Sequence, residues 1–264
     1  MTPPRIVATD LDGTLLTSTG TITPRTRNAL RSAREAGAEI VFVTARAPRG
    51  AGLIAEPAGV TGTAICSNGA IVYDLATDEI VRSHPLEPAA AREVAALLAA
   101  ALPGIGLAAE TGRNVLAEPA YTRRVSSDLA FYREVSSVFE AGEPIVKLLV
   151  LSNGHTADEM FTAAVAAIEG QTEVTHSGVD GMLEISAPGV IKAGALDWLC
   201  QERGVTPAEV VAFGDMPNDV AVLAFAGAGY AMANAHHLVL AATEHRTLSN
   251  DEDGVAVVLE RLFG

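Results

Sequence analysis

The chain has 264 residues, enough for one large domain or two modest domains with an apolar core. Its 18 basic residues against 32 acidic residues give a formal net charge of −14, which argues against a polyanion such as nucleic acid as a partner. The apolar fraction of 49% is rich in alanine, and no uninterrupted apolar run reaches the roughly 18 residues that a membrane-spanning helix needs. We therefore expect no membrane partner.

The cysteines and the amino terminus predict the compartment. Cys66 and Cys200 are the only two cysteines, and they are widely spaced in apolar surroundings, so buried free thiols in a reducing environment are the simplest account. Residues 1–5 lead directly into an apolar run without an export signal. The expected location is the cytoplasm.

The first apolar run ends on two acids. Residues 5–15 read Arg-Ile-Val-Ala-Thr-Asp-Leu-Asp-Gly-Thr-Leu, which predicts a strand that enters a glycine turn. Residues two apart on an extended chain lie roughly 6.5 Å apart on one side, so we expect Asp10 and Asp12 to face one cavity beyond the strand. One carboxylate would attack phosphorus once Mg²⁺ neutralises the phosphate, and the other would move a proton. The alternative is a polar turn without chemistry, since Asp and Gly favour turns for backbone reasons.

Strands and helices then alternate up to about Val81, with the spacing of a parallel α/β sheet. Residues 24–36 predict a helix, with Thr23 as its N-cap and Gly37 as its stop. Residues 39–44 predict a second strand. This part of the chain therefore predicts the first half of a core sheet.

Polar residues follow the predicted strands in this region. Thr44 ends the second strand, where its hydroxyl can hydrogen-bond a phosphoryl oxygen, and Arg46 comes two residues later. The segment Ser67-Asn-Gly-Ala70 follows another strand. These positions extend the predicted phosphate site.

The pattern changes between residues 82 and 187. The predicted elements there are a helix at 89–102, paired strands at 105–110 and 114–118, another helix, a strand at 145–151, a helix at 157–169 and further strands. This is a second α/β unit, inserted into a core made of residues 1–81 and 188–264. We expect it to form a cap over the carboxyl ends of the core strands, where it would exclude water and select the substrate.

Two charged segments follow the insertion. Lys192 begins a helix-like stretch, where the helix dipole disfavours a cation, so we expect an anion or a carboxylate within reach of its ammonium group. Residues 210–219 predict a third apolar strand that ends in Gly-Asp215, with Asn218 and Asp219 opening the next helix. Four acids at one edge would repel one another without a hard cation among them, and oxygen ligands favour Mg²⁺. They are Asp10, Asp12, Asp215 and Asp219.

These segments, in this order and over the whole chain, resemble the haloacid dehalogenase superfamily of phosphohydrolases. Ser67–Ala70 and the segment Asn250-Asp-Glu-Asp-Gly-Val-Ala256 resemble elements of its Cof-like branch. The resemblance implies an α/β fold, with a Rossmann-like parallel sheet core and an inserted α/β cap. The chain has Thr44-Ala45-Arg46 where the family often has Thr-Gly-Arg, and Ile191-Lys192-Ala193 where it often has Ser-Lys-Gly. Neither departure replaces a side chain with an implied catalytic role.

The resemblance also implies a role for the polar residues of these motifs. Asp10 would be the nucleophile and Asp12 the general acid/base, which also lends its backbone carbonyl to Mg²⁺. Asp10 and Asp215 would bind the metal through their side chains, with Asp219 as an acid behind them. Thr44 and Lys192 would also be catalytic. The residues that would hold the phosphoryl group or the substrate are Thr44, Arg46, Asn68, Gly69, Lys192 and Asn218.

The sequence therefore predicts a Mg²⁺-dependent phosphatase that acts on a small phosphorylated metabolite, such as a sugar phosphate, through an aspartyl-phosphate intermediate. One alternative is a phosphosugar mutase of the same superfamily, which returns the phosphoryl group to the substrate. The other is a non-catalytic, phosphate-responsive switch, against which Asp12 argues because it supplies a proton-transfer group. The expected assembly is a monomer or a small homo-oligomer.

Overall fold

The structure is a computed structural model that describes residues 3–123, 126–168, 170–176 and 181–264. The chain divides into two compact units, Met1–Val81 with Lys192–Gly264, and Arg82–Ile191. Residues 188–191, which the sequence pattern assigned to the core, group with the second unit. Among the described residues, no helix is long and apolar enough to cross a membrane.

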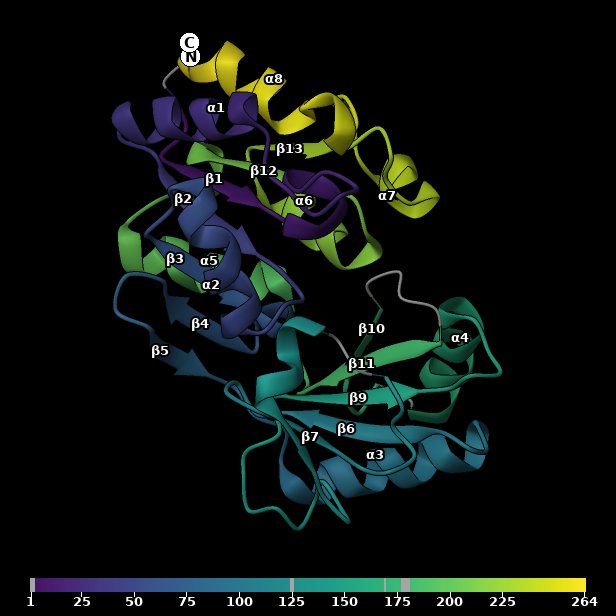
Figure 1. Cartoon of the computed structure of the whole chain (residues 1–264). Helices are drawn as coiled ribbons and strands as arrows, with labels where there is room; N and C mark the ends of the chain where they lie inside the picture. Colours follow the sequence, from purple (N-terminus) through teal and green to yellow (C-terminus); the bar gives the residue numbers. More distant parts are fainter. Residues whose placement is uncertain (1–2, 124–125, 169, 177–180) are drawn as a thin grey trace. The chain divides into compact units, whose positions relative to one another are not determined.

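The first sheet has eight strands in the described residues, in the order β14-β13-β12-β1-β2-β3-β4-β5 (Figure 1). Strand β1 pairs in parallel with β2 and β12, whereas β3 and β4 are antiparallel. All of β1 is buried, which requires cover on both faces of the sheet. The strands are β1 Ile6–Thr9, β2 Glu39–Val43, β3 Thr63–Cys66, β4 Ile71–Asp74, β5 Glu79–Ser83, β12 Val210–Gly214, β13 Ala228–Ala231 and β14 His245–Arg246. The predicted α/β class with a parallel core sheet is confirmed.

Helices supply that cover. Helix α1 packs against α8 and α2, and α5 packs against α6 (Figure 1). Helix α1 begins as predicted, because Thr23 Oγ1 accepts a hydrogen bond from Thr26 N at 3.0 Å, and Gly37 follows its end with a φ of 95°. The helices are α1 Pro24–Glu35, α2 Pro48–Ala58, α5 Lys192–Arg203, α6 Val220–Phe225, α7 His237–Ala242 and α8 Gly254–Phe263. Short turns of helix lie at Leu11–Leu15, Ser67–Gly69, Pro207–Glu209, Pro217–Asp219 and Asn250–Glu252.

The second unit has a six-stranded sheet in its described residues, in the order β10-β11-β9-β6-β7-β8. Its elements are α3 Pro88–Ala101, β6 Gly106–Glu110, β7 Val115–Ala117, β8 Tyr132–Glu134, β9 Lys147–Leu151, α4 Ala157–Ile168, β10 Glu173–Thr175 and β11 Met182–Ser186. Leu98 of α3 and Met160 of α4 are buried in one cluster with Leu148 of β9. The further helix predicted between residues 118 and 145 is wrong, because a short 3₁₀ helix, Ser126–Phe131, and strand β8 occupy that segment.

The order of the core strands determines where the site lies. Strands β12, β1, β2 and β3 are neighbours and run in parallel, so their carboxyl ends meet at one edge. The polar segments singled out above follow these ends: Asp10 after β1, Thr44 after β2, Ser67 after β3 and Asp215 after β12.

Candidate active site

Lys192 is the centre of a buried ionic cluster in the first unit. It is the first residue of α5, and its Nζ donates to Asp10 Oδ1 at 2.8 Å and to Asp219 Oδ1 at 2.7 Å. Its side chain is 1% exposed, and those of the two aspartates are 8% and 2% exposed. The fold thus brings together three residues that lie at the starts or ends of three different elements.

Asp215 lies beside this cluster and against the turn that follows β1. Thr14 Oγ1 donates to Asp215 Oδ1 at 2.7 Å. A Cβ atom on Gly13 would stand 2.3 Å from Asp215 Oδ2, and the φ of Gly13 is 77°, so both contact and conformation require glycine here. One carboxylate oxygen from each of Asp10, Asp215 and Asp219 lies within 4.8 Å of the others.

The charges of this cluster do not balance within the protein. Burial raises the pKa of Asp10 well above its usual value; Lys192 opposes the shift, and Asp219 and Asp215 add to it. Burial, reinforced by Asp219, raises the pKa of Asp215 to about 7. Burial alone would lower the pKa of Lys192, but the attraction of Asp10 and Asp219 outweighs it and the pKa is raised. One ammonium group faces three carboxylates, and this oxygen-only set fits a hard divalent cation.

Asp219 differs from the other two acids because both of its oxygens are used inside the protein. Its Oδ1 accepts from Lys192, and its Oδ2 accepts from the backbone N–H groups of Asp215 at 3.1 Å and Met216 at 3.0 Å. The better-placed side-chain ligands for a cation are therefore Asp10 and Asp215. This division agrees with the roles that the family resemblance implies.

Asp12 does not join the carboxylate cluster. Its side chain is 61% exposed, and Arg46 donates to both of its oxygens, from Nε to Oδ2 at 2.7 Å and from Nη2 to Oδ1 at 2.6 Å. Strand alternation led us to expect Asp10 and Asp12 to face one cavity, and this expectation stays a prediction. Asp12 lies in the turn Leu11–Leu15, where its φ and ψ are −77° and 121°, and the positive φ of Gly13 comes directly after it.

A second group of polar residues lies where β2 and β3 end. Asn218 Nδ2 donates to Asn68 Oδ1 at 3.0 Å, the N–H of Asn68 donates to the carbonyl of Thr44 at 3.1 Å, and the N–H of Arg46 donates to Thr44 Oγ1 at 3.1 Å. In the described part of the chain, Asn218 Oδ1 and Ser67 Oγ are buried without a hydrogen-bond partner. Buried polar atoms are seldom left unpaired, so these two indicate where a ligand would bind.

The loop Ser67–Gly69 that carries this group is conformationally strained. Its three residues have φ values of 50°, 58° and 100°, and all three are buried. This left-handed conformation is unfavourable for Ser67, whereas asparagine and glycine adopt it more readily, and such strain concentrates at functional sites. Gly69, predicted to contact substrate or phosphate, lies directly beside Asn68 in this loop.

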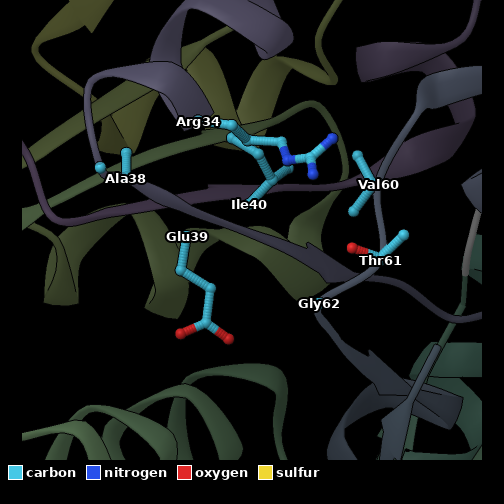
Figure 2. Close-up of a pocket in the computed structure, with 8 residues that line it drawn as sticks. Arg34, Ala38, Glu39, Ile40, Val60, Thr61 and Gly62 are labelled. Atoms are coloured by element: carbon cyan, nitrogen blue, oxygen red, sulfur yellow. The ribbon is translucent and has the colours of Figure 1, made fainter. Parts of the chain in front are cut away.

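A surface pocket of about 250 Å³ lies elsewhere in the first unit (Figure 2). Figure 2 labels Arg34, Glu39 and Thr61 among the side chains that line it, where β2 begins, so the pocket is at the opposite end of that strand from Thr44. Its charged groups are paired: Arg34 donates to the carbonyl of Gly59, and Glu39 accepts from Thr63 Oγ1 at 2.9 Å and Arg203 Nε at 3.1 Å. We assign it no catalytic role.

Sequence reasoning missed two residues that contact the site. Thr14 belongs to the quoted Asp-Leu-Asp-Gly-Thr segment, and its position next to the acids was a usable signal. Asn234 Nδ2 donates to the carbonyl of Gly13 at 2.8 Å, across 221 residues of sequence. No short motif signals that contact.

Comparisons with known proteins identify the family. The haloacid dehalogenase-like hydrolase family matches residues 7–259. Phosphatase YwpJ of Bacillus subtilis (strain 168) is 28% identical, over 98% of this chain and 100% of that protein. From the same organism, 5-amino-6-(5-phospho-D-ribitylamino)uracil phosphatase YitU is 27% identical, over 99% and 98% of the two chains. The solved structure of a haloacid dehalogenase-like hydrolase from B. subtilis has a TM-score of 0.83 and 26% identity, over 98% and 99% of the two chains.

The match spans nearly the whole chain, so the chain belongs to the haloacid dehalogenase-like hydrolase family, as its motifs predicted. Within that family it is a phosphoric monoester hydrolase.

Proposed function

We propose that this protein is a Mg²⁺-dependent phosphatase that hydrolyses a small phosphorylated metabolite, such as a sugar phosphate, through an aspartyl phosphate on Asp10. The observation that carries the proposal is the buried cluster in which Lys192 bridges Asp10 and Asp219, with Asp215 beside them. A buried excess of carboxylates at the carboxyl edge of a parallel sheet supports a cation and a phosphate at the same place.

Asp10 is the proposed nucleophile. Lys192 holds Asp10 through Oδ1 and prevents the side chain from turning away from the strand end. Mg²⁺, held by Asp10, Asp215 and the backbone carbonyl of Asp12, would neutralise the phosphate so that a carboxylate can attack phosphorus. Attack forms the bond from Asp10 to phosphorus and breaks the bond to the ester oxygen, and water later releases inorganic phosphate.

Asp12 is the proposed general acid and base. It would first give a proton to the leaving ester oxygen and then take one from the attacking water. The two hydrogen bonds from Arg46 orient its carboxylate. Arg46 is itself a proposed contact of the same phosphate.

The phosphoryl group is assigned to the polar residues at the ends of β2, β3 and β12. The unpaired Asn218 Oδ1 and Ser67 Oγ support a ligand here. The residues proposed to hold it are Thr44, Asn68, Gly69, Lys192 and Asn218. The second unit, Arg82–Ile191, is the proposed cap that selects the group attached to phosphate.

The net charge and the relatives support the proposed substrate class. A net charge of −14 favours a small anion over nucleic acid, because the Lys192 and Arg46 side chains reverse the field only locally. YitU, by its name, acts on a phosphorylated ribitylaminouracil, which supports a small metabolite here. The two buried thiols, Cys66 and Cys200, support a reducing compartment such as the cytoplasm.

Metal removal tests this proposal. We expect a panel of phosphate esters to yield free phosphate over many turnovers, excess chelator to stop the release, and Mg²⁺ to restore it. Ca²⁺ should bind but support turnover poorly, since its six to eight ligands tolerate a geometry unsuited to in-line attack. Colorimetric phosphate release measures each case. Full activity in excess chelator would refute the metal mechanism, and isomerised substrate with little free phosphate would identify a mutase.

A pair of glycines in α2 tests the role of Arg46. A Cβ atom on Gly50 would stand 3.3 Å from Arg46 Cβ and 3.5 Å from its Cδ, whereas nothing lies within 4 Å of a Cβ on Gly52. Alanine should favour the helix by about 1 kcal/mol at either position. We expect Gly50→Ala to shift Arg46 and lower kcat/KM by roughly 3- to 10-fold without loss of thermal stability.

Gly52→Ala is the matched control, and we expect the same gain in helix propensity with unchanged kinetics. Thermal unfolding and steady-state rates compare the two variants. Equal kinetics in both would show that the position of Arg46 does not matter for turnover.

A further inference from the structure

The segment Asn250–Ala256 resembles a family element, but the proposed chemistry gives it no role. In the structure its first residue contacts the turn Leu11–Leu16, which follows β1. Asn250 is 9% exposed, and its Nδ2 donates to the carbonyl of Leu16 at 2.9 Å. The backbone N–H of Asn250 donates to Asn234 Oδ1 at 3.0 Å, and Asn234 Nδ2 donates to the carbonyl of Gly13 at 2.8 Å. Two asparagines thus join the carbonyls of Gly13 and Leu16.

The direction of each of these bonds is unambiguous. A backbone carbonyl only accepts and a backbone N–H only donates, so Asn234 must turn its amide nitrogen to Gly13 and its amide oxygen to Asn250. Asn250 must likewise turn its amide nitrogen to Leu16. Leu16 N also donates to the carbonyl of Leu11 at 2.9 Å and closes the turn upon itself. The turn Leu11–Leu16 is therefore closed internally and held from outside at two carbonyls.

This turn carries or contacts the groups that are proposed to bind the cation. It includes Asp12, and Gly13 and Thr14 both contact Asp215. Because a Cβ on Gly13 would overlap Asp215 Oδ2, the backbone there is in close contact with that carboxylate and a shift of one moves the other. Two residues after Asn234, the N–H of His236 donates to the carbonyl of Asp215 at 2.8 Å. The segment 234–236 therefore holds both Gly13 and Asp215.

We propose that Asn234 and Asn250 are positioning residues that hold the turn Leu11–Leu16, so that the carbonyl of Asp12 and the carboxylate of Asp215 are placed for the cation. The inference rests on the proposed function, since it names the residues that support the same site. Neither asparagine need touch substrate. They act through the carbonyls of Gly13 and Leu16.

Asn234→Ala is the main test, because Asn234 is exposed and its truncation opens no cavity in the core. Asn250→Ala tests the buried end of the same chain of hydrogen bonds. Asn28→Ala, on the exposed face of α1, is the matched control. Calorimetric titration with Mg²⁺ alone should give a dissociation constant about 10-fold or more weaker in the two test variants, as for other residues that orient metal ligands, and an unchanged constant in the control.

Two further readouts separate positioning from a general loss of stability. Amide hydrogen exchange of residues 11–16, measured without metal, should become faster in Asn234→Ala while exchange in β1 and β12 stays as in the wild type. In steady-state measurements, kcat should fall by a larger factor than KM changes, because the residues proposed to bind phosphate are not mutated.

Unchanged Mg²⁺ affinity together with unchanged exchange of residues 11–16 in Asn234→Ala would overturn the inference. The exchange experiment needs neither metal nor substrate, so it also decides the inference if the proposed function fails. A wild-type protein that neither binds Mg²⁺ nor releases phosphate refutes the proposed function, whereas faster exchange of residues 11–16 in Asn234→Ala still supports the part of the inference that Asn234 and Asn250 hold the turn Leu11–Leu16.

Discussion

Replacing Asp10 with asparagine should reduce phosphate-ester hydrolysis by a factor on the order of 10⁶, the scale of loss when a catalytic nucleophile is removed. The amide has the shape of the carboxylate and can still accept the hydrogen bond that Lys192 donates to Oδ1. It cannot form the acyl phosphate, so chemistry stops while the fold remains. Rapid acid quench with ³²P-labelled substrate should trap labelled wild-type protein and no labelled Asp10→Asn protein.

Asp197→Asn is the matched control for this prediction. Asp197 lies on α5, the helix that begins with Lys192, and accepts a hydrogen bond from Gln201 at 2.9 Å, which asparagine can also accept. We expect wild-type turnover from this variant. Near wild-type turnover from a sequence-verified Asp10→Asn preparation would rule out the covalent mechanism.

The second large effect concerns Lys192. Its replacement by alanine leaves the buried Asp10 and Asp219 carboxylates without their cation, and breaking a buried ion pair by removing one partner costs about 3–5 kcal/mol of folding stability. The proposed phosphoryl site would also lose a positive charge next to Asp10. We expect kcat/KM to fall by a factor of roughly 10²–10³. The factor should be similar for every phosphate ester, since the phosphoryl group is common to all of them.

Arg203→Ala controls for the loss of one positive charge at the other end of the same helix. Arg203 is 48% exposed and pairs with Glu39, at the opposite end of β2 from Thr44. Thermal unfolding and a panel of esters, ranked by kcat/KM, measure both variants. A Lys192→Ala enzyme that loses one substrate while others react normally would move Lys192 out of the phosphate site.

The local elements around the site followed from the sequence alone. Helix α1 begins at Pro24 after a capping Thr23, because a side-chain oxygen satisfies an N–H group that the first helical turn cannot pair. Apolar runs that end on Asp10, Thr44 and Asp215 became parallel neighbours. Polar residues after such strands must meet at one edge, so the order of the motifs indicated both the location of the site and the family.

The sequence did not reveal how the second unit is built between its predicted helices and strands. The segment between β7 and β9 carries β8, which has three residues and pairs in parallel with β7. So short a strand leaves no periodic pattern to recognise. The buried ion pair of Lys147 with Glu184, at 2.9 Å, likewise joins two strands that only the sheet order makes neighbours.

Composition, apolar periodicity and motif order determined the class of protein and the edge of the sheet at which the polar residues of the motifs meet. Tertiary structure alone decided which atoms meet. Asp12 meets Arg46 across 34 positions, and Asn234 reaches Gly13 because packing brings together residues 221 positions apart. Side-chain direction in an irregular turn and contacts between distant segments depend on the whole packed core, and no local pattern in the sequence encodes them.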